Sequence, residues 1–381
     1  MNTWTPAEVF PPGEFIREEL DARGWTQTDL AEIMGRPLPV LNQIIAGKKA
    51  ITPETAHELG EAFGTSSELW LNLEMAYRLA RSQGPQGAVS RRARLFRIAP
   101  LKEMTKRGWI TGYTNLDQAE DELRRFLGCH SLDNRTPLEF AARSSGESSG
   151  QRRIIQEAWC HRVLRLAETI DVPEFSQPRF SQAVKSLRPL AQKPQDVQQV
   201  PRILGSLGVR FVVVEGLPKA RIDGATLWLE SQNPVIAVSL RYDRIDWFWH
   251  TLLHECSHVL HEDANSVDDD LVGSRKEDRV VSSQYEERAD SEAANTLIPE
   301  ADLDSFVTGH RPFISKVAIM QFASLHKVHP GIVVGQLQFR GVVPYAANRE
   351  MLVPIRNLLA ESALVDGWGC VPGSGGEGKR E

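Results

Sequence analysis

The chain has 381 residues, of which 41% are hydrophobic and 25% charged, and its formal net charge is −6. These values are ordinary for a globular protein, and the length accommodates two or three domains with cores of their own. No apolar run approaches the roughly 20 residues of a membrane span. The first residues lack the basic and then apolar stretch of a secretory signal. Four scattered cysteines (129, 160, 256 and 370) without CxxC spacing indicate reduced thiols, so we expect a cytoplasmic protein with no membrane partner.

Residues 1–80 predict a bundle of short helices. Thr26 is suited to cap a helix start, and a turn around Gly35 leads into a second helix at 37–46. Thr52 is placed to cap another helix. Helix, short glycine-containing turn, helix is the helix-turn-helix pattern, so we expect a DNA-binding domain here.

This segment resembles the HigA-like antitoxin helix-turn-helix domains, which bind operator DNA as dimers and often repress their own operons. The resemblance rests on Thr26-Gln27-x-x-Leu30-Ala31, Met34-Gly35-Arg36-Pro37-Leu38 and the run from Ile45 to Thr55. It implies an operator-DNA partner and a possible homodimer through this domain. It also implies base-edge contacts from Arg36, Leu38, Val40, Asn42 and Gln43, and phosphate contacts from Lys48 and Lys49.

The charge of this segment is unusual for a DNA-binding module. Residues 1–80 contain six Lys/Arg and twelve Asp/Glu, a balance of −6, whereas such modules normally carry a basic excess. The run 36–49 is locally cationic. We therefore expect DNA to contact this run, and a protein-interaction role stays open as the alternative.

The middle of the chain predicts a linker at 81–92 and a mostly helical region at 93–200. Apolar residues have helical spacing at 116–127 and 154–167, and 144–150 reads as a flexible loop. Residues 81–200 hold twenty Lys/Arg against thirteen Asp/Glu, a balance of +7. This basic surface could face an acidic partner or nucleic acid, and a solvated helical surface is the simpler interpretation.

Three β-branched runs, 208–215, 224–230 and 235–240, predict strands of a small sheet, with a turn at Asn233-Pro234 between the last two. A sheet with a free edge can bind an extended peptide through main-chain hydrogen bonds. We expect the strands within 225–240 to hold a peptide substrate in this way.

An H-E-x-x-H motif, His254-Glu255-Cys256-Ser257-His258, lies in an apolar, helix-length segment at 247–261. Residues four apart share one helix face, so both histidines can bind one metal ion. Glu255 lies beside them and can take a proton from a metal-bound water. The pattern predicts a zinc hydrolase with Zn²⁺ as cofactor.

A second helical stretch, 285–299, offers the third ligand. We choose Glu286, with Asp290 one turn later accepting a hydrogen bond from the far nitrogen of a ligand histidine. Glu287 is the competing ligand and Glu292 a weaker one. Three protein ligands leave one position open, as in catalytic zinc sites. The neighbouring His250, Cys256 and His261 are interpreted as packed or surface residues.

Residues 210–340 resemble the ImmA/IrrE family of metallopeptidases. The matching pieces are 234–240, the His254–His258 motif, and Glu286-x-x-Ala289-Asp290 running into Leu297-Ile298-Pro299. The chain departs from the family at Glu292, where an aromatic residue is frequent. Members are zinc endopeptidases that cleave DNA-bound repressors, so the resemblance implies ligands His254, His258 and Glu286 with Glu255 as base.

These observations predict a mostly α protein with a small β-sheet (α+β). A helix-turn-helix bundle at 1–80 precedes a zincin-like HExxH metallopeptidase domain at 201–345, and the tail at 346–381 is expected to be partly disordered. The predicted function is a transcriptional regulator with a zinc-dependent endopeptidase arm that cleaves a repressor, an antitoxin-like partner or itself. The alternative is a HigA-like antitoxin or operator-binding repressor whose peptidase fold binds or senses without catalysis.

Overall fold

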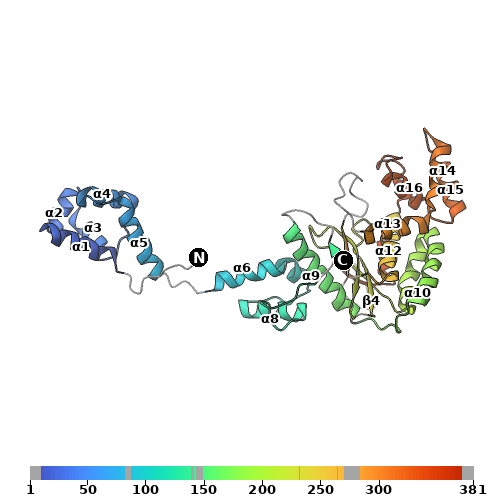
Figure 1. The fold of residues 1–381 in the computed structure, drawn as a ribbon, viewed down its shortest axis with the longest axis horizontal. Helices are drawn as coiled ribbons and strands as arrows, with labels where there is room; N and C mark the ends of the chain where they lie inside the picture. Colours follow the sequence, from blue (N-terminus) through green and yellow to red (C-terminus); the bar gives the residue numbers. More distant parts are fainter. Residues whose placement is uncertain are drawn as a thin grey trace. The chain divides into compact units, whose positions relative to one another are not determined.

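A computed structural model of the chain (Figure 1) describes residues 10–81, 87–138, 141–142, 149–230, 232–263, 265–269 and 284–370. The chain divides into two compact units, residues 1–89 and 90–381, and each is described by itself. Within the ranges given, no helix has both the length and the apolar character to cross a membrane.

The N-terminal unit is a bundle of five described helices. They are α1 (Pro12–Arg23), α2 (Gln27–Ile33), α3 (Leu38–Ile45), α4 (Pro53–Phe63) and α5 (Ser67–Arg81).

Local sequence explains where these helices begin and end. Thr26 and Asp29 form a reciprocal capping box at the start of α2, and the Thr52 side chain accepts the Thr55 N–H at the start of α4. Gly35, at φ +60°, makes the turn after α2 that separates it from α3. The predicted helix-turn-helix is therefore confirmed as a structure.

The second unit is built around a mixed sheet. Its strands lie in the order β1-β5-β3-β4-β2-β6. Their bounds are β1 (Ala141–Ala142), β2 (Arg210–Val214), β3 (Ile222–Trp228), β4 (Pro234–Val238), β5 (Ser266–Asp269) and β6 (Leu364–Asp366). β4, β2 and β6 run parallel to one another, whereas β3 is antiparallel to both of its neighbours.

Helices cover both faces of this sheet. Along β2, Val212 and Val214 enter one apolar cluster while Phe211 and Val213 enter another, as the alternation of a strand requires. Figure 1 shows α9 (Ser149–Ala167) on one side and α12 (Ile245–Leu260) with α13 (Gln284–Leu297) on the other. The α+β prediction is thus confirmed in its coarse form.

The remaining elements are helical as well. They are α6 (Ala88–Ile98), α7 (Leu101–Lys106), α8 (Leu116–Leu127), α10 (Gln177–Ala183), η1 (Val184–Gln192), η2 (Pro194–Gln199), α11 (Val200–Ser206), α14 (Glu300–His310), α15 (Lys316–His326), α16 (Pro330–Phe339), η4 (Arg349–Met351) and α17 (Arg356–Ala360).

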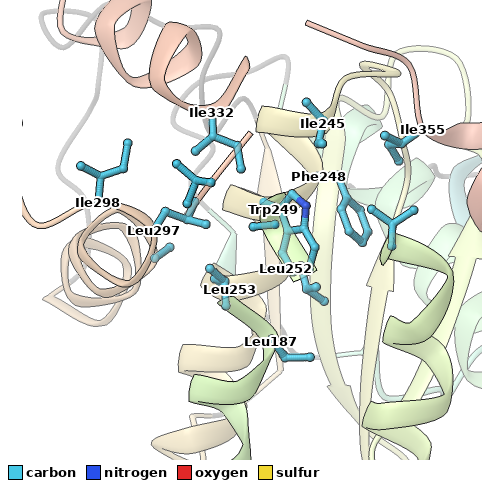
Figure 2. Close-up of a cluster of buried hydrophobic side chains, with 14 of the residues drawn as sticks. Leu187, Ile245, Phe248, Trp249, Leu252, Leu253, Leu297, Ile298, Ile332 and Ile355 are labelled. Carbon is cyan, nitrogen blue, oxygen red and sulfur yellow. The ribbon is translucent and has the colours of Figure 1, made fainter. Parts of the chain in front are cut away.

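The helix that carries the H-E-x-x-H motif is the centre of one layer. Figure 2 shows Trp249, Leu252 and Leu253 of α12 among side chains from other elements, including Leu187, Leu297 and Ile332. All residues of α12 from Ile245 to Val259 except His250 are buried. Burial on every side fixes the position and rotation of this helix.

Three features of the structure add detail to the expected organisation of the chain. Residues 88–98, expected to begin in a linker, form helix α6, and 82–86 lie outside the described residues. The expected middle region joins the sheet in one unit, because α9 packs on β2 and β3. The expected tail supplies strand β6 at the sheet's edge, and 371–381 lie outside the described residues.

The expected peptide-binding edge is wrong as placed. β3 pairs with β5 and β4, and β4 pairs with β3 and β2, so both strands are interior to the sheet. Their main-chain groups are already used in the ladder. The predicted runs did not show this, because β5, which pairs with β3, comes from a later segment that was not predicted as a strand, and strand order is set by long-range packing.

Candidate metal centre and nucleic-acid interface

Helices α12 and α13 bring three potential ligands together. The Nε2 atoms of His254 and His258 are 3.0 Å apart. The carboxylate of Glu286 is 3.4 Å from His254 Nε2 and 3.6 Å from His258 Nε2. These three residues are buried, and they form a group with metal-ligand character among the described residues.

Carboxylates hold the outer nitrogens of both histidines. His254 Nδ1 lies 3.0 Å from Asp290 Oδ1, and His258 Nδ1 lies 2.9 Å from Asp263 Oδ2. Arg288 forms an ion pair with the same Asp263 oxygen. A carboxylate in this place favours a proton on Nδ1 and leaves the lone pair on Nε2, as in many metal sites.

The arrangement fits a zinc ion. Tetrahedral bonds of about 2.0–2.1 Å separate ligand atoms by roughly 3.3 Å. The two Nε2 atoms are 3.0 Å apart, Glu286 Oε2 is 3.4 Å from that of His254, and Glu286 Oε1 is 3.6 Å from that of His258. Two imidazole lone pairs and a carboxylate repel one another at this range. A cation between them converts the repulsion into attraction, so this donor set is suited to hold a metal.

Glu255 is fully buried and is positioned by strand β3. The Thr226 hydroxyl donates to Glu255 Oε2 at 2.8 Å. A Cβ added at Gly224 would lie only 2.3 Å from Glu255 Oε1, so only glycine leaves room for this carboxylate. The carboxylate is therefore fixed by contacts with β3 on a helix that carries two ligands.

The alternative ligands lie elsewhere. Glu287 is exposed. Glu292 accepts a hydrogen bond from Ser257 at 2.6 Å and lies 3.0 Å from His261 Nε2. Cys256 is buried in the apolar core, and burial raises the pKa of its thiol well above the usual range.

Three contributors to this site were not predicted from the sequence. Gly224 and Thr226 contact Glu255 although they precede it by about thirty residues in the sequence, so no local sequence pattern indicates this contact. Asp263 carries a weak signal, since it follows the end of α12 five residues after His258. A polar residue just past a metal-binding helix is a candidate for that role.

A cavity of about 300 Å³ adjoins Asp290, the carboxylate that holds His254. His250 is half-buried and lines it together with Asp290. The other walls come from α12, α13 and α16, with apolar contributions from Trp247, Ile298, Ile332 and Phe339.

In the N-terminal unit, α3 presents one polar face to solvent. Leu41, Ile44 and Ile45 are buried in the bundle. The exposed positions fall on the opposite side at helical spacing, namely Pro39, Asn42, Gln43 and Ala46. Asn42 and Gln43 therefore lie on the free face, while Leu38 and Val40 are half-buried and pack against the core.

The cations expected around α3 have different environments. Lys48 and Lys49 are exposed directly after the helix. Arg36 is half-buried and forms a two-point ion pair with Glu58 of α4, with Nη2 to Oε1 at 3.0 Å. This hydrogen bonding raises the pKa of Arg36. The ion pair with Glu58 occupies Nε and Nη2 of Arg36, so this side chain is held against α4.

Comparisons with known proteins address the N-terminal unit. The family model HTH_3, a helix-turn-helix, matches residues 16–70. The "Uncharacterized HTH-type transcriptional regulator YddM" of Escherichia coli K12 is 36% identical over 72 residues, which cover 19% of this chain and 77% of the relative. Virulence-associated protein I of Dichelobacter nodosus is 31% identical over 80 residues, covering 21% of this chain and 74% of the relative. Through this unit the chain belongs to the helix-turn-helix family of transcriptional regulators.

Solved structures with sequence similarity include two of the antitoxin type. The Pseudomonas aeruginosa antitoxin HigA with the higBA promoter is 31% identical and covers 21% of this chain and 88% of its own, with a TM-score of 0.20. A HigA-family addiction module antidote protein from Coxiella burnetii is 29% identical and covers 28% of this chain and 99% of its own, also with a TM-score of 0.20.

Proposed function

We propose that this helix-turn-helix regulator carries a zinc-dependent endopeptidase site in its second unit. The observation that carries the proposal is the buried His254–His258–Glu286 group beside the buried carboxylate of Glu255. The substrate class is a protein partner, such as a DNA-bound repressor or an antitoxin-like protein.

The chemistry divides between the metal and the protein. A zinc ion held by the three ligands would supply an electrophile that polarises a peptide carbonyl and acidifies water. Glu255, held by Thr226, would accept the proton of the attacking water and deliver it to the leaving amine. Asp263 and Asp290 would keep both imidazoles in the metal-binding tautomer.

Three glutamate variants distinguish the proposed catalytic base, a proposed zinc ligand and a residue outside the site. The probe is β-casein, an unstructured protein, incubated with zinc-supplied full-length chain and read by mass spectrometry. Glu255→Gln should retain zinc and lose cleavage, and Glu286→Gln should lose both. The matched control is Glu287→Gln, an exposed neighbour that should keep both. Undiminished cleavage by Glu255→Gln would exclude this residue as the base.

We infer operator DNA as the other partner, through the exposed face of α3. Asn and Gln side chains can form paired hydrogen bonds with adenine in the major groove, and Asn42 and Gln43 are exposed on this face. The name of the Escherichia coli relative, an HTH-type transcriptional regulator, agrees with this role. Met75 and Leu79, four residues apart on one face of α5, are exposed and offer apolar contacts to a second copy.

A gel shift with the DNA upstream of the chain's own gene tests this part. Asn42→Ala with Gln43→Ala should abolish the sequence-specific shift. Glu61→Ala, an exposed change on α4, is the control and should leave it intact. A wild-type protein without a salt-sensitive shift would contradict operator binding.

One observation favours a second candidate function, a metal-sensing regulator without peptidase activity. His254, Glu255, His258 and Glu286 are each at most 3% exposed, whereas a peptide must reach the reacting atoms. If the site only senses metal, zinc would change the affinity of the chain for DNA. Glu255→Gln would then leave this effect of zinc on DNA binding unaltered. The β-casein experiment and a gel shift with and without zinc distinguish the two functions.

A further inference from the structure

The cavity of about 300 Å³ beside Asp290 lies along the same two packed helices, α12 and α13, as the metal-ligand group. On α12, Trp247 and His250 line the cavity and precede the ligand His254 by seven and four residues, so all three share one helix face. On α13, Asp290 lines the cavity four residues after the ligand Glu286. The cavity and the metal-ligand group are therefore successive positions along one helix pair.

The two helices run in opposite directions along this line. On α12 the cavity precedes His254, whereas on α13 the lining residue Ala294 follows Glu286 by eight residues. A helix rises about 1.5 Å per residue, so the cavity begins about 6 Å from His254, at His250, and extends to about 10 Å, at Trp247. An extended peptide advances about 3.3 Å per residue, so these distances correspond to about two or three residues of a bound peptide.

The cavity combines buried apolar walls with an exposed rim. Its buried apolar side chains are at most 6% exposed and include Trp247, Leu297, Ile298 and Ile332, of which the last three are labelled in Figure 2. Ser291, Asn295 and Phe339 line it as exposed residues, so a ligand can enter from solvent. The volume is at the lower end of the range of about 300–1,000 Å³ for ligand pockets, which suits a single large side chain.

Charge does not determine what this cavity binds. Three of its lining carboxylates already have partners, namely Asp246 with Arg244 at 2.6 Å, Asp290 with His254 at 3.0 Å and Glu300 with Arg340 at 3.7 Å. Arg340 is shared with a further carboxylate, Asp304. The fourth lining carboxylate, Glu287, is exposed to water. The cavity therefore selects an occupant by its size and apolar surface.

We propose that this cavity receives a large apolar side chain, such as phenylalanine or leucine, of the polypeptide on which the metal centre acts. The side chain would lie about two or three residues from the bond to be cleaved. This inference rests on the proposed peptidase function and names a preference of that site. A peptide placed at the ligand atoms of His254 and Glu286 can extend along α12 and α13, and burial of a side chain remote from the reacting bond helps to hold that bond in place.

The cleavage sites in β-casein test this preference. Zinc-supplied full-length chain should cut bonds that have a large apolar residue at one fixed position two or three residues away. Ala294→Leu enlarges a half-buried lining residue and should slow cleavage at these bonds at least about tenfold, because the larger side chain takes the place of the substrate's. The matched control is Ala301→Leu, the same change at an exposed position of α14 outside the cavity, which should cleave like the wild type. Zinc content and thermal melts check that both variants fold.

A binding measurement separates this inference from the peptidase function itself. N-Acetylphenylalaninamide and N-acetylalaninamide are titrated into the zinc-supplied full-length chain by isothermal titration calorimetry, which requires no cleavage. The phenylalanine compound should bind at least about tenfold more tightly than the alanine compound, and Ala294→Leu should remove this difference whereas Ala301→Leu should keep it.

The two readouts identify which proposal fails. Cleavage of β-casein without the apolar preference, together with equal binding of both compounds, would overturn the role of the cavity and leave the peptidase function intact. Binding of the phenylalanine compound in the cavity, without any cleavage by the wild type, would contradict the peptidase function and with it the role of the cavity in cleavage.

Discussion

Replacing Gly224 by alanine tests how strand β3 positions Glu255. The added Cβ would lie 2.3 Å from Glu255 Oε1 and 2.6 Å from Thr251 Cγ2. Non-bonded carbon contacts are normally about 3.5–4.0 Å, so the Glu255 carboxylate and the Thr251 methyl group must move away from the strand by about 1 Å. Overpacking of this kind costs about 1–3 kcal/mol of folding free energy.

The chemical effect should exceed the loss of stability. A displacement of about 1 Å at a reacting group lowers rates by roughly a hundredfold, so cleavage of β-casein should fall by that order. Zinc should stay bound, because the added methyl group meets neither ligand histidine among its nearest atoms.

Calorimetry measures the loss of stability, and the β-casein assay measures the loss of cleavage. The temperature at the midpoint of unfolding should fall by a few degrees. Gly112→Ala is the control, because a Cβ there meets no atom within 4 Å. A Gly224→Ala protein that unfolds and cleaves like the wild type would refute the described packing of Glu255 on β3.

Three further predictions address the metal, DNA and pH. Asp263→Asn weakens the hydrogen bond to His258 and should lower zinc affinity about 10- to 100-fold in a competition titration with a chelator. Lys48→Ala with Lys49→Ala should reduce the slope of log affinity against log salt by about 2 in gel shifts. Burial lowers the pKa of His329, so the folded state favours neutral imidazole. As pH falls through about 6.5, the unfolded chain takes up this proton first and stability declines, less so in His329→Asn.

Each of these has a matched control. Asp304→Asn removes an exposed carboxylate paired with Arg340 and should leave zinc affinity unchanged. Arg17→Ala removes an exposed cation of α1 and should leave the salt slope unchanged. His57→Asn changes an exposed histidine and should keep the wild-type dependence of unfolding on pH. A control that behaves like its test variant would contradict the corresponding assignment.

The sequence predicted those features of the fold and the site that depend on neighbouring residues. The four-residue spacing of His254 and His258 places both on one face of α12, and Thr26 and Thr52 mark helix starts through side-chain hydrogen bonds to nearby N–H groups. The β-branched runs at 210–214 and 234–238 form strands because both faces of the sheet are covered.

Long-range packing explains what the sequence did not reveal. Gly224 and Thr226 contact Glu255 only after β3 is placed against α12. Likewise, the partner of Arg36 is Glu58 of another helix, so a residue expected at a base edge is engaged in an ion pair. Strand β6 comes from a segment near the end of the chain, and its pairing with β2 could not be read from composition.

The most direct test of the central claim is the metal content of the purified chain. Elemental mass spectrometry would compare the wild type with His254→Ala, after zinc is supplied to both. We expect about one zinc per chain in the wild type and a loss of zinc in the variant, because the ligand atoms of His254, His258 and Glu286 lie within 4.8 Å of one another. Wild-type protein without bound metal, or a variant that retains it, would contradict the metal site and the peptidase proposal built on it.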